Sequence, residues 1–207
     1  MEIKPAELEK HGYSPFEELK HDDLIPFVQR AIKFRTAYSY FYHALFILFF
    51  FLTLSFYIYL IWNNSLRWNK GLGAIMLGVA LPFLTIPLHE VIHMLAYKIV
   101  GAPKTTMYAN IRKFYFAALA DQFVVNRQEF VRIALAPFIV LFRLFSAPLF
   151  LNNPFIQLTF LSALFIHIAT CSGDFALLNY FAHHVDKELI TYDDARNKIT
   201  YFYEKVA

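Results

Sequence analysis

Cysteine is almost missing from this chain of 207 residues, which contains only Cys171. A single cysteine excludes an internal disulfide and any zinc or iron–sulfur site built from several thiolates. Glycine and proline are scarce as well, at 6 and 9 residues. No repeat with a period of about 20–50 residues is visible, so collagen-like, low-complexity and repeat architectures are excluded.

Charge is also sparse. Charged side chains make up 17% of the chain and apolar ones 58%, whereas soluble domains average about 25% and about 45–50%. The net charge of +3 is too small to indicate nucleic-acid binding, so we expect no nucleic-acid partner. The composition is that of an integral membrane protein, whose first partner is the lipid bilayer.

Long apolar stretches set the expected architecture, because a membrane crossing needs about 20 mainly apolar residues. Four stretches meet this requirement, at residues 41–62, 71–97, 133–151 and 155–179. We therefore predict an all-α membrane protein with four transmembrane helices. Its expected parts are an N-terminal segment, a four-span domain and a tail, at residues 1–40, 41–180 and 181–207.

Lysine and arginine are distributed unevenly between the loops, which predicts the orientation. The N-terminal segment holds six, the loop 98–132 six and the tail four. The two loops on the opposite side hold two between them. We expect a multi-pass protein of a bacterial cytoplasmic membrane, with both termini and the loop 98–132 in the cytoplasm.

The N-terminal segment carries helix signals. In Ser14-Pro15-Phe16-Glu17 a capping residue is followed by proline and then glutamate, which is typical of a helix start. Apolar residues then recur at helical spacing between residues 27 and 34. The pattern predicts one or two surface helices, either lying among the lipid headgroups or packed on the bundle.

The loop after the second span contains strand-favouring residues and predicts a small cytosolic β-hairpin. Its edge would be able to pair with an extended peptide. The first run consists of Thr105, Thr106, Tyr108, Ile111, Phe114, Tyr115 and Phe116, and the second of Phe123, Val124 and Val125.

The second span carries the chemistry. His89-Glu90-Val91-Ile92-His93 is an H-E-x-x-H motif. Residues four apart share a helix face, so both imidazoles can reach one metal ion. Glu90 is placed to exchange a proton with a water that the metal activates. Ionisable side chains in an apolar span are costly and indicate function.

A catalytic zinc ion needs a third protein ligand. At 1.5 Å per residue, His89 and His93 lie about 13 and about 7 Å from the inner boundary, and Asp174 of the fourth span lies at about 9 Å. Asp174 is the only carboxylate in any span besides Glu90. We therefore predict a Zn²⁺ site formed by His89, His93 and Asp174.

Other ligands stay open. His183 and His184 follow the fourth span and can bend back, and Cys171 lies one turn before Asp174, although a buried structural thiol is favoured there. His167 is expected about 10 Å deeper, in a core hydrogen bond, and His43 at the interface.

Proline and arginine also occur within the spans. Pro82 and Pro87 lie in the second span, and Pro87 predicts a kink just before His89. Arg143 in the third span reaches toward Asp174 or a developing oxyanion, or forms a structural ion pair or snorkels to the interface.

These residues resemble the putative zincin peptidase family, a former domain of unknown function that is distantly similar to site-2 intramembrane proteases. The resemblance rests on His89-Glu90-x-x-His93, on Ala134-Leu135-Ala136-Pro137 and on Ser172-Gly173-Asp174, and covers about residues 70–180. It implies zinc bound by His89, His93 and Asp174, with Glu90 as the catalytic acid and base.

The main hypothesis is a membrane-embedded zinc metallopeptidase that hydrolyses a peptide or membrane-protein substrate near the cytoplasmic face. The alternative is a non-catalytic membrane zinc-binding protein, acting as a carrier, sensor or scaffold. Transport normally needs polar ligands from several spans. The first span supplies none and the third only Arg143, which disfavours a carrier. Nothing in the sequence indicates the oligomeric state.

Overall fold

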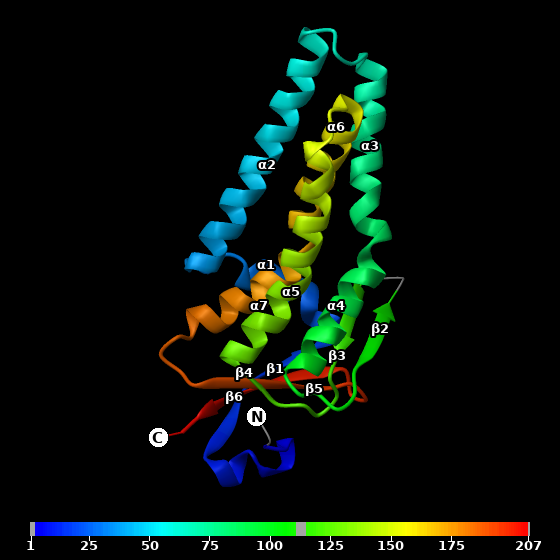
Figure 1. Ribbon diagram of the computed structural model, residues 1–207. Coiled ribbons are helices and arrows are strands. Elements are labelled where there is room, and N and C mark those ends of the chain that lie inside the picture. The colour runs from blue at the N-terminus through cyan, green and yellow to red at the C-terminus, as the bar shows by residue number, and fades with distance from the viewer. Residues whose placement is uncertain (1–2, 111–114, 207) are drawn as a thin grey trace. The chain divides into compact units, whose positions relative to one another are not determined.

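The computed structural model describes residues 3–110 and 115–206 (Figure 1). Its α-helices are α1 Leu24–Ala31, α2 Ala37–Trp62, α3 Trp68–Leu84, α4 Ile86–Ile99, α5 Arg127–Ser146, α6 Pro154–Thr170 and α7 Ser172–His183. Its strands are β1 Tyr13–Lys20, β2 Thr106–Asn110, β3 Tyr115–Leu119, β4 Val125–Asn126, β5 Leu189–Asp194 and β6 Ile199–Lys205. Short 3₁₀ turns complete these elements, at Pro5–Glu7, Glu9–His11, His21–Asp23 and Ala147–Phe150.

The chain forms two compact units, and both are built from separate stretches of sequence. One unit consists of Met1–Ser39, Glu90–Ala136 and Gly173–Ala207. The other consists of Tyr40–His89 and Pro137–Ser172. The strands lie in the first unit, and α2, α3 and α6 supply most of the second.

Within the described residues, three helical segments are long and apolar enough to cross a membrane: α2, the joined α3 and α4, and α5 with the turn that follows it. The helices α6 and α7, bent by 46° at their junction, make a fourth if the pair is one span. In α2 the mean hydropathy of the most apolar window is 2.5, yet only 11% of that window is buried within the protein. An apolar surface of this extent is typical of a helix surrounded by lipid.

Two of these segments are interrupted. A single residue, Thr85, separates α3 from α4, two positions before Pro87, which has no N–H to continue the backbone ladder. Likewise Cys171 separates α6 from α7. The predicted kink before His89 is therefore present as a break at Thr85, whereas the break at Cys171 had no proline to reveal it.

Small residues allow α3 and α6 to pack closely in the second unit (Figure 1). Gly78 and Ala74 are buried on the face of α3 that meets α6. A Cβ added at Gly78 would lie 2.2 Å from the carbonyl oxygen of Thr159 and 2.6 Å from Cβ of Ser162. The helices thus approach at a distance that only glycine permits, as is common between membrane helices.

Gly78→Ala should destabilise the protein, because the new methyl group would meet backbone that has to move. Overpacking of this kind typically costs about 1–3 kcal/mol. The matched control is Gly73→Ala in the same helix, where an added Cβ meets nothing within 4 Å. Thermal unfolding in detergent should separate the two variants. Equal midpoints would contradict this account of the packing.

A four-stranded antiparallel sheet in the first unit corrects the all-α prediction. Its strand order is β1-β6-β5-β4, so the first and last strands of the chain pair with each other. Tyr13 lies opposite Lys205, and Lys20 opposite Ile199. The segment Ser14-Pro15-Phe16-Glu17 belongs to β1 and not to a helix start, and Pro15 is tolerated because β1 is an edge strand with a bulge between Pro15 and Glu17.

The predicted hairpin is present, with a different pairing. Strands β2 and β3 both come from the first predicted run and its continuation, with Thr106 opposite Leu119. The second run contributes Val125 to β4, which pairs with Thr191 of β5. Ile111 and Phe114 of the first run lie outside the described residues.

The helix predicted from the apolar spacing at residues 27–34 is present as α1 Leu24–Ala31, and it packs on α7. Phe27 and Ala31 are buried, and the Phe27 ring lies 5.2 Å from that of Tyr180 in α7. The side-chain amide of Asn179 donates to the carbonyls of Ala31 and Phe34 at 2.6 and 2.9 Å. These bonds tie the C-terminal end of α1 and the turn that follows it to α7.

Asp193 should make the stability of the sheet depend on pH. Burial raises its pKa from 3.8 to about 6, and the charge of Asp121 adds to the rise although Thr200 donates a hydrogen bond at 2.6 Å. The folded state therefore prefers protonated Asp193. Its contribution is present below about pH 4 and is lost as the pH rises through about 6.

Asp193→Asn removes this titration, so the variant should gain stability relative to the wild type between pH 5 and pH 7. Denaturant unfolding followed at both pH values measures the difference. A constant difference would show that Asp193 does not titrate in this range.

Candidate metal centre

Helix α4 carries three residues of the predicted site on two adjoining faces. His89 and His93 are one turn apart in an uninterrupted helix, so their imidazoles project from the same side. Glu90 and His93 are buried, at 6% and 8% exposure. Buried ionisable groups of this kind need partners.

The partner of His93 on one side is a backbone carbonyl of α5. The Nδ1 N–H of His93 donates to the carbonyl oxygen of Ile133 at 3.0 Å. In an α-helix that carbonyl would accept from residue 137, but residue 137 is proline, inside α5, and has no N–H. Pro137 therefore leaves the Ile133 carbonyl available to His93.

This bond determines which nitrogen of His93 can bind a metal. Because a carbonyl only accepts, the proton lies on Nδ1, and the lone pair of Nε2 is directed away from α5. Metal-binding histidines commonly donate their second N–H in this way. Sequence reasoning noted Ala134-Leu135-Ala136-Pro137 only as part of a resemblance. The missing N–H at Pro137 was the signal for its role.

Asp174, in the first turn of α7, lies on the other side of His93. Its Oδ1 is 3.2 Å from Nε2 of His93. Two such ligands on a tetrahedral zinc ion are about 3.4 Å apart, given zinc–ligand distances of about 2.0–2.2 Å. The ligand atoms of His89, His93 and Asp174 all lie within 4.8 Å of one another. The donor set of two imidazoles and a carboxylate, and its spacing, thus fit zinc.

His167 and Cys171 lie near His89, and their ligand atoms form a second group with it within 4.8 Å. The expected core hydrogen bond of His167 is present, with its Nε2 3.3 Å from the carbonyl oxygen of Phe138. Cys171 is a buried thiol whose Sγ lies 3.8 Å from Nδ1 of His167. The nearness of both to His89 was missed, because the depth of His167 was compared with that of Asp174 and not with that of His89.

The remaining candidates have other surroundings. His183 stacks on Phe34 with ring centroids 4.0 Å apart. His184 contacts the carbonyl of Tyr180 through Nδ1 at 3.0 Å, and the ring of His43 lies 5.3 Å from that of Tyr42. Arg143 is exposed, and in residues 3–110 and 115–206 we find no hydrogen bond or ion pair of its guanidinium. Its role at the site stays a prediction.

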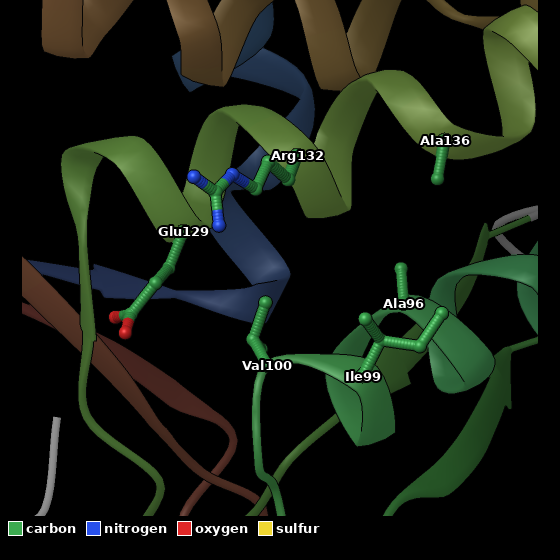
Figure 2. A pocket seen from close by; sticks show the side chains of 6 residues that line it. All are labelled: Ala96, Ile99, Val100, Glu129, Arg132 and Ala136. Carbon is green, nitrogen blue, oxygen red and sulfur yellow. The ribbon is translucent and has the colours of Figure 1, made fainter.

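A cavity of about 390 Å³ lies between α4 and α5 (Figure 2). Figure 2 shows Ala96 and Ala136 facing each other across it, with Arg132 toward its other end. Ala96 follows His93 by one turn, and Ala136 follows Ile133 by one turn, so this end of the cavity is nearest to the candidate ligands. The cavity is lined by Ala96, Ile99, Val100, Glu129, Arg132 and Ala136.

Helices long and apolar enough to cross a membrane, a group of two histidines and an aspartate, and a buried glutamate beside it are consistent with a membrane protein that carries a zincin-like site. The family model described as "Putative zincin peptidase" matches residues 82–187, which is half of the chain and includes both helices that carry the candidate ligands. The chain belongs to the putative zincin peptidase family, as the resemblance of its motifs predicted. Searches of curated proteins and of solved structures give no significant match.

Pro137→Ala should weaken zinc binding without removing a ligand. The alanine N–H would compete with His93 for the Ile133 carbonyl, and such second-layer partners are worth about 10- to 100-fold in metal affinity. Affinity is measured by competition with a chelator of known strength. Pro82→Ala, at the buried proline inside α3, is the control and should leave affinity unchanged. Equal affinities for both variants would refute the role of Pro137.

Proposed function

We propose that this protein is a membrane-embedded, zinc-dependent metallopeptidase that hydrolyses peptide bonds near the cytoplasmic face of the membrane. The observation that carries the proposal is the convergence of His89, His93 and Asp174 beside the buried Glu90. Three protein ligands and an open fourth position are the usual arrangement of a catalytic zinc site. A zinc ion held there supplies Lewis-acid activation of water and of the scissile carbonyl.

Glu90 supplies the proton transfer. It is adjacent in sequence to His89 and precedes His93 by three residues, so its carboxylate belongs to the same turn of α4 as both ligands. In the proposed reaction Glu90 accepts a proton from the attacking water and then delivers it to the departing amine nitrogen. Its burial keeps bulk water from competing for that proton.

The cavity between α4 and α5 supports substrate binding beside the ligands. Its walls are mainly apolar and small at Ala96 and Ala136, which leaves room for a substrate side chain one turn from His93. It is bounded by the ends of α4 and α5 that adjoin the loop 98–132. That loop is rich in lysine and arginine, which favours entry of the substrate from the cytoplasmic side.

The strand pairing gives a second argument for four membrane crossings, and this argument does not depend on how lysine and arginine are distributed between the loops. Strands β1, β4, β5 and β6 belong to one sheet and therefore lie on one side of a membrane. Two spans lie between β1 and β4 in the sequence, and they return the chain to the same side of the membrane. Because β5 is on that side as well, an even number of spans must lie between β4 and β5. Helix α5 is one of them, which makes the bent pair α6 and α7 the other. Both termini then lie on the same side.

Glu90→Gln separates catalysis from metal binding. The amide keeps the size of the side chain and cannot accept the proton, so cleavage should fall by about 100-fold or more while zinc content stays at the wild-type level. Zinc is measured by elemental analysis of the purified full-length protein, and cleavage with a panel of membrane-anchored fluorescent peptide reporters. Asp174→Ala should lose zinc as well as cleavage.

Val91→Ala, at an exposed position of the same helix, is the matched control and should behave as wild type. Undiminished cleavage by Glu90→Gln would disprove the role of Glu90. A wild-type protein that purifies without zinc and binds none would refute the whole proposal. Zinc binding with no cleavage of any reporter would favour the non-catalytic zinc-binding alternative.

A further inference from the structure

A second group of metal-ligating side chains meets at His89. It contains His89, His167 and Cys171, whose ligand atoms all lie within 4.8 Å of one another. His167 and Cys171 are four residues apart at the end of α6, so one turn presents an imidazole and a thiol together. The ring centroids of His89 and His167 are 6.4 Å apart.

His167 is oriented in the same manner as His93. It is 1% exposed, and its Nε2 lies 3.3 Å from the carbonyl oxygen of Phe138 in α5. The carbonyl accepts from Nε2–H, so the lone pair lies on Nδ1. Nδ1 is 3.8 Å from Sγ of Cys171. An imidazole nitrogen and a thiolate sulfur on one tetrahedral ion are about 3.6 Å apart.

We propose that His89, His167 and Cys171 form a second metal position, which prefers a soft or borderline ion such as Cd²⁺, Zn²⁺ or Cu⁺. Thiolate and imidazole ligands together select such ions. On binding, the Cys171 thiol releases its proton to solvent and the sulfur donates its lone pair, so no oxidant or reductant is needed.

The two metal positions exclude one another. His89 belongs to both groups, and one imidazole nitrogen binds one ion at a time. An ion held by Cys171 and His167 through the nitrogen of His89 that faces His93 and Asp174 therefore withdraws His89 from those two residues. A soft ion in the second position therefore inhibits cleavage. This regulatory part rests on the proposed peptidase function, whereas the binding of the ion does not.

Cd²⁺ titration of the purified full-length protein tests the binding, with the ultraviolet thiolate-to-cadmium charge-transfer band as readout. Because Cys171 is the only cysteine, any such band comes from it. We expect a band that saturates at one ion per chain in the wild type. It should persist in Asp174→Asn, vanish in Cys171→Ser, and need at least 10-fold more Cd²⁺ in His167→Gln. His183→Gln is the matched histidine control and should titrate as wild type.

No band in the wild type, or a band unaffected by His167→Gln, would overturn the second metal position. Inhibition is tested separately, by cleavage of the membrane-anchored reporters at rising Cd²⁺ in the presence of zinc. Cys171→Ser should tolerate at least 10-fold more Cd²⁺ than the wild type. If Cd²⁺ inhibited Cys171→Ser and the wild type equally, the mutual exclusion of the two metal positions would be overturned, while the second metal position would stand. If the wild type showed the charge-transfer band but cleaved no reporter, the result would count against the proposed peptidase function and not against the second metal position.

Discussion

Pro137 removes one N–H from the backbone ladder of α5, and the Ile133 carbonyl accepts from His93 instead. This single bond satisfies two buried polar groups at once, a carbonyl and an imidazole, either of which is costly to leave unpaired away from water. It also directs Nε2 of His93 toward Asp174. The geometry of the candidate centre follows from this bond more than from any other contact.

Interruptions in apolar helices place the remaining polar groups. The break at Thr85 precedes His89 by one turn, and the break at Cys171 precedes Asp174 by three residues. A straight α6 and α7 would separate His167 and Asp174 by about 10 Å along one axis. His89 nevertheless has ligand-atom neighbours from both sides of the break at Cys171, His167 from α6 and Asp174 from α7. In a membrane, irregular backbone is tolerated where protein groups satisfy it.

The sequence predicts the parts of the site that depend on local spacing. His89 and His93 follow from a four-residue interval, and Asp174 follows from the rarity of carboxylates in apolar spans. The proximity of His167 to His89 depends on the packing of α6 against α3, which leads into α4, and spacing within one segment does not reveal that packing. The role of Pro137 requires knowing which side chain faces the carbonyl it leaves free. Neither fact is contained in the residue pattern.

The four-stranded sheet is a second feature that local sequence does not reveal. Ser14-Pro15-Phe16-Glu17 has the local chemistry of a helix start, and pairing with β6 near the other end of the chain overrides it. Hydropathy identifies the spans because their surroundings, lipid, act on each segment separately. Strand pairing across the full length of the chain has no comparable local signal, since β propensity depends on the neighbouring strand.

The pairing of Tyr13 with Lys205 also has a consequence for biosynthesis. During translation β1 is made before the apolar helices, and its partner β6 is made only after them. Until then β1 presents an unpaired edge to the surrounding proteins. A nascent chain that stops early can insert its helices but cannot cover this edge. The sheet can therefore close only after every apolar helix between β1 and β6 has been made.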